Sequence, residues 1–126
     1  MYSKVNKIFG LLAFILPFIL YFSTMAPTTS FWDCGEFIAT SYILGVPHPP
    51  GSPLFLLLGN VFSHIPILDD IGARVNLISP IFSALSVMFL YYIIVHLIEE
   101  FNGEPKDVSD VIIINVSAII AALTFA

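Results

Sequence analysis

The strongest constraint on this chain is an uncharged apolar run near its N-terminus. Residues 8–26 read IFGLLAFILPFILYFSTMA and contain no charged side chain. As an α-helix, a run of this length reaches about 28 Å, which matches the hydrocarbon core of a bilayer. Pro17 lies in the middle of the run, where membrane helices tolerate proline better than soluble helices do. The run therefore predicts a membrane-spanning helix, with a cleaved signal peptide ending at Ala26 as the alternative.

Two further apolar runs predict a multi-span membrane protein. Residues 71–98 form a long second span, and residues 111–126 form a third run that is shorter than a full span. We therefore expect a truncated third helix, and we interpret residues 1–126 as the N-terminal fragment of one larger multi-span domain. Hydrophobic residues make up 58% of the chain and charged residues 10%, which excludes a soluble or disordered protein. The predicted fold class is all-α, with polytopic membrane helices.

The basic residues indicate how the spans cross the membrane. Lys4 and Lys7 precede the first span and Lys106 follows the second, whereas Arg74 lies near the start of the second span. Because cytoplasmic loops carry the excess of Lys and Arg, we expect a cytoplasmic N-terminus and an extracytoplasmic loop at residues 27–70. The membrane would be a bacterial inner membrane or the endoplasmic reticulum. So few basic residues exclude a nucleic-acid partner and leave membrane lipid as the expected surrounding.

The outer loop separates into two short helices and a proline-rich connection. Residues 30–44 are predicted to form the first short helix. Residues 45–52 are predicted to be extended or turned, with a type II turn centred on Pro50 and Gly51. Residues 53–64 are apolar on nearly every side, and as a helix they reach about 18 Å, which is too short to cross. We expect both short helices to lie at the membrane interface.

Two carboxylates three residues apart are the sharpest chemical signal. Asp33 and Glu36 face the same direction if the segment is helical, and Trp32 lies beside them. Carboxylates among apolar residues can have raised pKa values and act as general acid or base. The structural alternative is a capping box at a helix N-terminus, which fits both Ser30 with Asp33 and Asp33 with Glu36. The spacing alone leaves capping and catalysis open.

Other polar residues of the loop also admit two interpretations. His48 precedes two prolines and either presents its imidazole to a phosphate or leaving group, or is held by the turn at the interface. Arg74 either binds a carboxylate or phosphate, or extends to the interface. Asp69 and Asp70 are expected to cap the second span, with metal binding as the weaker alternative. The spacing of Cys34 and the histidines does not match a zinc site, so no metal site is predicted.

Two motifs at a fixed distance resemble the signature of a known family. Residues 30–38 read SFWDCGEFI, and residues 44–54 read LGVPHPPGSPL. Together they resemble the transmembrane protein 260-like family, also called domain of unknown function 2723. The flanking plan of one span, two short interfacial helices and a second span resembles the N-terminus of C-type membrane glycosyltransferases, including the protein O-mannosyltransferases.

The resemblance implies an enzyme that moves a sugar, expected to be mannose, from a polyprenyl-phosphate carrier to a Ser or Thr hydroxyl of a protein. In such families an acidic residue of the first outer loop lies at the active site, which maps to Asp33 or Glu36. The motif acid of the mannosyltransferases is followed directly by Glu, whereas two residues intervene here, so the choice of base stays open. His48, Arg74 and Trp32 are the expected substrate contacts. No cofactor is expected beyond the lipid-linked donor, and the metal requirement is left open.

The implied chemistry is a direct displacement with inversion at the anomeric carbon. One carboxylate takes the proton of the acceptor hydroxyl, which contributes about 10²–10⁴ in rate, and a cation stabilises the departing phosphate. The fragment alone is expected to be inactive. Two other classes remain as alternatives. A transporter or lipid-handling protein predicts charges within the spans and paired repeats, and a structural subunit predicts that the two acids only cap a helix.

Overall fold

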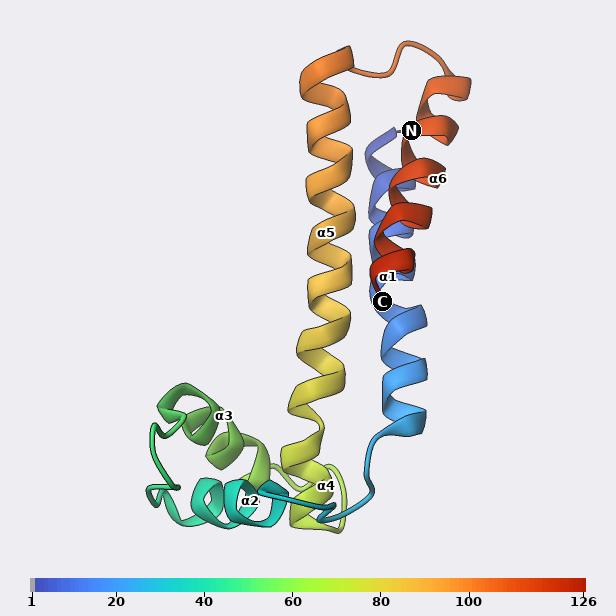
Figure 1. The fold of residues 1–126 in the computed structure, drawn as a ribbon. Helices are drawn as coiled ribbons and strands as arrows, with labels where there is room; N and C mark the ends of the chain where they lie inside the picture. The colour runs from blue at the N-terminus through green and yellow to red at the C-terminus, as the bar shows by residue number, and fades with distance from the viewer. Residues whose placement is uncertain (1) are drawn as a thin grey trace. The chain divides into compact units, whose positions relative to one another are not determined.

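The computed structural model describes residues 2–126, and this part of the chain is all-α, as expected (Figure 1). Its helices are α1 (Tyr2–Thr24), α2 (Cys34–Ile43), α3 (Pro53–His64), α4 (Ile71–Asn76), α5 (Ile78–Asn102) and α6 (Val108–Phe125). Three stretches are long and apolar enough to cross a membrane, namely α1, the combined α4 and α5, and α6. The expectation of three candidate spans and additional short helices is confirmed.

The candidate spans differ from the predicted ones at their ends. Helix α1 begins at Tyr2, upstream of the predicted start, because lysines are good helix formers and end only the apolar run. Helix α5 continues to Asn102 and stops before Gly103, whose φ of 83° is left-handed. Helix α6 follows Asp107, whose side chain accepts a hydrogen bond from the Asp110 amide. The ends are thus fixed by backbone capping, which hydropathy does not report.

A single residue interrupts the second candidate span. Leu77 lies between α4 and α5, and the two helices together form an apolar stretch of 32 residues. Pro80 lies in the first turn of α5. Because proline has no N–H and its ring crowds the carbonyl four residues earlier, Pro80 cannot continue the helical ladder to Asn76. The break between α4 and α5 thus lies about one turn before Pro80.

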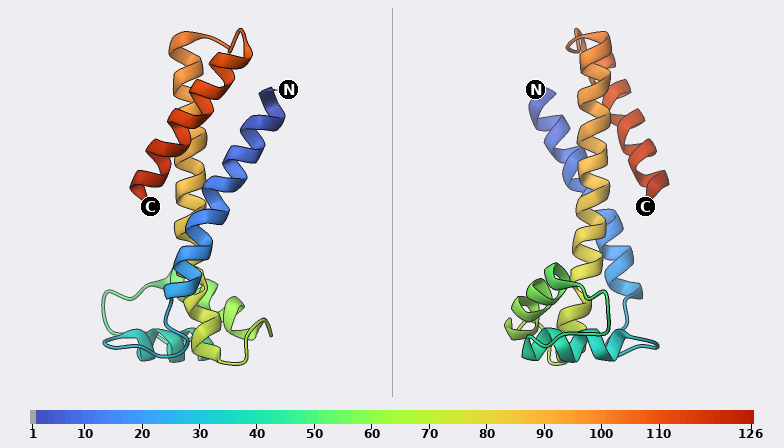
Figure 2. Two further views of the ribbon diagram at one scale, coloured as in Figure 1. Left: turned by 90° about the vertical axis from the view of Figure 1, so that its right-hand side faces the viewer. Right: turned by 60° about the vertical axis from the view of Figure 1, so that its left-hand side comes forward.

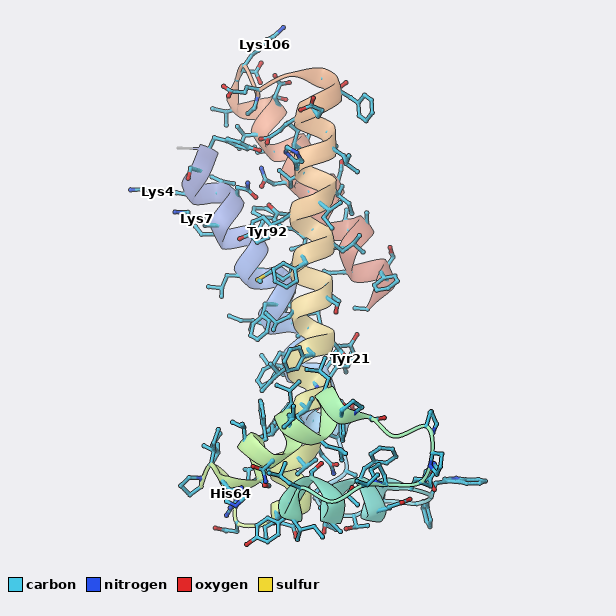
Figure 3. All side chains as sticks on the ribbon, turned by 90° about the vertical axis from the view of Figure 1, so that its left-hand side faces the viewer. Lys4, Lys7, Tyr21, His64, Tyr92 and Lys106 are labelled. Carbon is cyan, nitrogen blue, oxygen red and sulfur yellow. The ribbon has the colours of Figure 1, made fainter. Side chains whose placement is uncertain are left out.

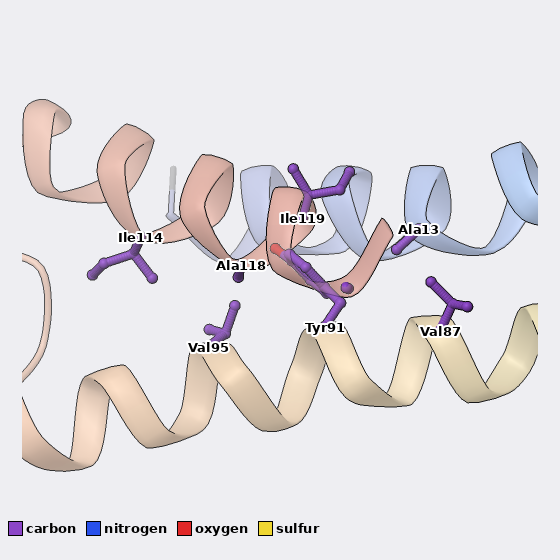
Figure 4. Packing of buried hydrophobic residues seen from close by; sticks show 8 residues of the cluster. Ala13, Val87, Tyr91, Val95, Ile114, Ala118 and Ile119 are labelled. Atoms are coloured by element: carbon purple, nitrogen blue, oxygen red, sulfur yellow. The ribbon is translucent and has the colours of Figure 1, made fainter. Parts of the chain in front are cut away.

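Within the described residues, 2–21 and 81–126 form one compact unit, which we call the three-helix unit. Figure 2 shows α1 and α6 on either side of α5. Figure 4 shows that Val87, Tyr91 and Val95 of α5 face the other two helices. The buried cluster between the three helices consists of Ala13, Val87, Tyr91, Val95, Ile114, Ala118, Ile119 and Ala122. Alanines at these positions allow the helix backbones to approach closely, which is the usual means of packing helices in a membrane.

A buried polar network joins the same three helices. The Tyr91 hydroxyl lies 2.8 Å from Asn6 Oδ1 of α1 and 2.5 Å from Asn115 Oδ1 of α6. Asn115 also donates to the Val111 carbonyl at 2.7 Å. Tyr91 and Asn115 are fully buried. Since an unpaired polar group in an apolar interior is costly, this network favours one register of the three helices over its alternatives.

Three lysines lie at one end of the three-helix unit. Figure 3 shows Lys4 and Lys7 near the start of α1 and Lys106 in the loop between α5 and α6, with their side chains directed away from the helices. These are the residues on which the sequence-based orientation depends.

Residues 22–80 form a second compact unit, which we call the loop unit. In it, α2, α3 and α4 contact one another, and Ile38, Val75 and Ile78 form its buried apolar cluster. Helices α2 and α3 approach closely at Gly59, where an added Cβ would lie 2.4 Å from Ser41 Oγ. Helix α3 has the predicted bounds, with Ser52 before it and a proline at its first position. The loop unit contains every residue predicted to act on substrate.

Candidate functional site

The segment before α2 brings Asp33 to the start of the helix. Asp33 is the N-cap residue of α2, but its side chain accepts no capping hydrogen bond. The Glu36 carboxylate is hydrogen-bonded to His48. Neither capping box expected as the structural alternative is therefore formed by these side chains. The two carboxylates are left for another role.

The end of α2 is held by a contact with α3. Helix α2 ends at Leu44, whose φ of 52° is left-handed, and Asn60 of α3 donates to the carbonyls of Ser41 and Tyr42 at 3.0 Å each. These bonds satisfy carbonyls that the end of a helix leaves unpaired. Sequence reasoning did not assign Asn60 a role, although an amide within an apolar helix is the kind of signal that marks such a contact.

The turn that carries His48 differs from the predicted one. The His48 carbonyl accepts a hydrogen bond from the Gly51 amide at 3.1 Å, so Pro49 and Pro50 are the central residues of the turn, and the bond between them is cis. The expected type II turn centred on Pro50 and Gly51 is wrong by one residue. Gly51, with a φ of 76°, follows the central pair because it adopts left-handed geometry without steric cost.

Glu36 binds His48 through both of its carboxylate oxygens. Oε1 accepts the His48 main-chain N–H at 2.8 Å, and Oε2 lies 2.7 Å from ring Nδ1. The Phe37 ring meets the imidazole edge-on, with ring centroids 6.0 Å apart, and Phe55 of α3 supports Phe37 in the same manner. The imidazole is thus held by a carboxylate and by an aromatic ring.

Asp33 joins this pair to complete a three-residue cluster. Its Oδ2 lies 3.9 Å from His48 Nε2, the ring nitrogen that Glu36 leaves free. Asp33, Glu36 and His48 each offer a ligand atom within 4.8 Å of the others. Among residues 2–126, this is the one set of three His, Cys, Asp or Glu side chains arranged so that a metal ion could bind. The sequence motifs singled out these residues, and the structure brings them together.

Mutual contact shifts two pKa values in the cluster. The hydrogen bond from the His48 ring, followed by the one from its main chain, lowers the pKa of Glu36. The hydrogen bond to Glu36 and its negative charge raise the pKa of His48, and Asp33 adds to the rise. The two residues therefore favour the ionised pair, with a carboxylate facing an imidazolium.

Trp32 lies beside the cluster in the chain, and its side chain is open to solvent. It is 96% exposed and has a φ of 61°, in the left-handed region where a bulky residue is rare. Such backbone geometry costs about 1–2 kcal/mol and is found preferentially at functional sites. An exposed indole next to two carboxylates offers a flat apolar surface to a ligand.

Arg74 does not share hydrogen bonds with the cluster. Its guanidinium donates to the carbonyls of Leu68, Ser63 and Asp69 at 2.5, 3.0 and 3.3 Å. These bonds fasten the connection between α3 and α4. Asp70 caps α4 as expected, by accepting a hydrogen bond from the Ala73 amide at 2.9 Å. This bond, followed by a hydrogen bond from the Thr28 hydroxyl, lowers the pKa of Asp70.

An apolar groove adjoins the segment that carries His48. It has a volume of about 420 Å³ and lies between the connection after α2 and the start of α3, lined by residues 44–47 and 50–53 together with Leu56 and Leu57. On α3, Leu54, Leu57 and Val61 are exposed at spacings of three and four residues. This row gives the short helix one continuous apolar face, as an interfacial helix requires.

The three candidate spans indicate a multi-pass membrane protein. Its loop unit contains a cluster of two carboxylates and an imidazole. The chain belongs to the family described as protein O-mannosyl-transferase TMEM260 N-terminal domain, which matches residues 33–126. The matched region contains Asp33, Glu36 and His48. The family resemblance drawn from the two loop motifs is therefore confirmed.

Curated relatives bear the same name. Protein O-mannosyl-transferase tmem260 of Dictyostelium discoideum is 37% identical over 82 residues, which cover 64% of this chain and 10% of that protein. Protein O-mannosyl-transferase TMEM260 of Mus musculus is 38% identical over 65 residues, which cover 52% of this chain and 9% of that protein. The chain thus spans about a tenth of the length of these relatives. No solved structure matches the chain.

Proposed function

We propose that this chain contributes an active-site loop to an enzyme that transfers mannose from a polyprenyl-phosphate carrier to a Ser or Thr hydroxyl of a protein. The observation that carries the proposal is the convergence of Asp33, Glu36 and His48 within 4.8 Å, in a chain of an O-mannosyl-transferase family. A structural subunit in which both acids cap α2 does not account for this arrangement, because Asp33 makes no capping bond and Glu36 binds His48.

We infer that the transfer takes place on the extracytoplasmic or lumenal face. Lys4, Lys7 and Lys106 share one end of the three-helix unit. In the chain, one apolar helix of membrane-spanning length separates Lys4 and Lys7 from the loop unit. With the lysines in the cytoplasm, the loop unit lies across the membrane from them. The donor on that face is lipid-linked, which suits an enzyme that works without a soluble nucleotide sugar.

The reaction proceeds by direct displacement at the anomeric carbon. The acceptor hydroxyl oxygen forms a bond to this carbon while the bond to the phosphate oxygen breaks, and the bonding electron pair leaves with the polyprenyl phosphate. A loop carboxylate, Asp33 or Glu36, takes the hydroxyl proton. The phosphate departs as a stable anion, so its departure requires a nearby cation more than a proton. One displacement inverts the anomeric configuration.

Two other features of the loop unit suit this substrate. The exposed indole of Trp32 can stack on the apolar face of a pyranose ring. The groove before α3, with the apolar row of Leu54, Leu57 and Val61, can seat the isoprenoid part of the donor. Arg74 and His48 are the cationic candidates for phosphate contact, but the described bonds of Arg74 are to main-chain carbonyls.

The test is sugar transfer by the whole purified protein, with polyprenyl-phosphate mannose as donor and a Ser/Thr peptide as acceptor. Asp33→Asn and Glu36→Gln are compared with Asp69→Asn, which removes an exposed acid of the same loop unit outside the cluster. We expect at least one cluster variant to lose about 10²-fold or more in kcat, while Asp69→Asn retains activity. Full activity in both cluster variants, or no transfer by the unchanged protein, would refute the proposal.

A further inference from the structure

The two carboxylates of the cluster have different surroundings, although the sequence treats them alike. Both oxygens of Glu36 are engaged by His48, at 2.8 and 2.7 Å. Asp33 accepts no helix-capping bond, and its Oδ2 lies 3.9 Å from His48 Nε2. The Asp33 side chain is 62% exposed, against 38% for Glu36. The arrangement is a chain of three groups, with the imidazole in the middle and Asp33 at the open end.

We propose that Asp33 is the group that accepts the proton of the incoming hydroxyl, and that Glu36 is a positioning residue that holds His48 Nε2 toward Asp33. This inference rests on the proposed function, because it assigns roles within the same transfer. It assigns the role of general base to one of the two carboxylates and places His48 on the side of the anomeric carbon that the acceptor hydroxyl approaches. Glu36 then has no contact with the reacting atoms.

Glu36 is unsuited to the role of base because its oxygens already accept two N–H groups. A carboxylate in such contacts binds a further proton weakly, and its reach toward a substrate is blocked on the side that His48 occupies. The direction of its pKa shift agrees, since contact with His48 lowers the pKa of Glu36. Asp33 has room for a hydroxyl beside it, and no such bond fixes its carboxylate.

The short distance between Asp33 and His48 places them on the same side of the reacting carbon. In a direct displacement, the base and the cation that receives the leaving oxygen lie on opposite sides of the anomeric carbon. The base is hydrogen-bonded to the acceptor oxygen, and the cation is hydrogen-bonded to the leaving oxygen on the other side of the anomeric carbon. These two hydrogen bonds and the two oxygen–carbon distances keep the base and the cation roughly 6 Å or more apart. Nε2 and Oδ2 are 3.9 Å apart. His48 therefore serves the acceptor half, and the departing phosphate takes its cation from another segment of the protein.

The role of His48 follows from how its ring is held. With Nδ1–H bound to Glu36, Nε2 faces Asp33, as in active sites where a carboxylate fixes the orientation of a histidine. When the ring is protonated, Nε2–H can donate to Asp33 and turn one carboxylate oxygen toward the acceptor. The charged groups that face the imidazole are Asp33 and Glu36, and the adjoining Phe37 is apolar.

The deciding experiment measures the pH dependence of kcat and kcat/KM in the whole enzyme. We expect Asp33→Asn to lose about 10²-fold or more in kcat at every pH. We expect Glu36→Gln to lose about 10–100-fold and to shift the alkaline limb of its profile to lower pH, because His48 then loses its proton more readily. Glu36→Asp should restore part of the activity and part of the shift. A residue needed only for folding would not move this limb.

Two variants of His48 provide the matched comparison. A Gln side chain can place its amide near the position of Nε2, whereas an Asn side chain can place its amide near Nδ1. We therefore expect His48→Gln to retain more activity than His48→Asn, and both to lack the alkaline limb. Thermal unfolding of each variant shows which of them are folded, and rates are compared among folded variants.

The possible outcomes separate the inference from the function on which it rests. If Glu36→Gln is as inactive as Asp33→Asn and its residual profile keeps the original alkaline limb, the assignment is refuted while mannosyl transfer stands. Full activity of Asp33→Asn with an inactive Glu36→Gln would reverse the two roles. If the unchanged enzyme transfers no mannose, the proposed function fails, and the assignment fails with it.

Discussion

Glu36 is hydrogen-bonded to both the main-chain amide and the ring of His48, although the two residues are twelve positions apart in the chain. The contact ties the first turn of α2 to the proline-rich connection. It thus links the two sequence motifs by which the family is recognised. An ionic contact of this kind makes the stability of the loop unit depend on pH.

The pair should stabilise the protein most in a window between about pH 4.5 and 6.5. Glu36 has a pKa lowered from its usual 4.5, so its contribution is present above that value and is lost as the pH falls through the lowered pKa. His48 has a pKa raised from its usual 6.5, so its contribution is complete below that value and is lost as the pH rises through the raised pKa. In thermal unfolding of the whole protein, His48→Gln should lower the midpoint more at about pH 5.5 than at about pH 9. Equal losses at both pH values would contradict the ionic pair.

Arg74 should act on stability through three main-chain bonds. Removing the guanidinium in Arg74→Ala leaves carbonyls of Ser63, Leu68 and Asp69 without these donors and should cost about 1.5–3 kcal/mol in free energy of unfolding. Arg74→Lys should recover only a part, because an ammonium lacks the planar fork that reaches several carbonyls at once. Hydrogen exchange of the segment between α3 and α4 measures the effect, with Lys106→Ala as an exposed control. Unchanged protection in Arg74→Ala would show that these bonds contribute nothing.

The close approach of α2 and α3 should not tolerate a side chain at Gly59. An added Cβ would lie 2.4 Å from Ser41 Oγ and 2.7 Å from its Cβ, so Gly59→Ala should destabilise the protein by about 1–3 kcal/mol. Gly45→Ala is the comparison, since its added Cβ would meet Ile43 at 3.4 Å, an ordinary contact. Unfolding midpoints of the two variants provide the measurement. Similar stability of both would mean that the helices separate at little cost.

The polar network of the three-helix unit should respond to loss of one hydroxyl. Tyr91→Phe removes the bonds to Asn6 and Asn115 and should reduce the free energy of unfolding by about 1 kcal/mol. Tyr92→Phe makes the same chemical change on the neighbouring residue, whose ring lies against Gly10 (Figure 3). We expect the Tyr91 variant to be the less stable in detergent. If the two variants unfold together, the network does not stabilise the packing.

Membrane orientation can be tested with cysteines introduced at exposed positions. Val46 is 89% exposed in the loop unit, and Glu104 lies in the loop between α5 and α6. Because Cys34 of the loop unit is itself a free thiol, both variants are made in a cysteine-free background that contains Cys34→Ser. In sealed vesicles of known orientation, an impermeant maleimide added from the extracytoplasmic side should label Val46→Cys directly. It should label Glu104→Cys only after the vesicles are opened. The reverse pattern would invert the predicted topology and remove the loop unit from the proposed face.

The sequence predicted those parts of the fold that depend on local patterns. Three apolar stretches predicted the candidate spans, and the apolar segment after Ser52 predicted α3 with its observed bounds. The break at Leu77 was less accessible, because it arises from a missing backbone donor at Pro80, one turn further on. The ends of α5 and α6 were missed for a similar reason, since capping depends on backbone geometry.

The residues of the candidate site could be predicted from the sequence, but the contacts between them could not. The motifs indicated Asp33, Glu36 and His48, yet spacing alone could not distinguish a capping carboxylate from one that binds an imidazole. That difference depends on the turn after Pro47, which returns the chain toward α2. The hydrogen bonds of Asn60 could not be predicted from the sequence either, because the carbonyls that accept them lie on another helix.

The loop unit is one unbroken stretch, residues 22–80, whereas the three-helix unit is assembled from the segments on both sides of it. The loop unit is therefore a contiguous insertion between the two segments that form the three-helix unit. Under the proposed function, donor or acceptor preference can diverge among relatives through changes inside the insert, with no change to the interhelical contacts around Tyr91. The same proposal implies that exchanging this segment between relatives would give hybrid transferases.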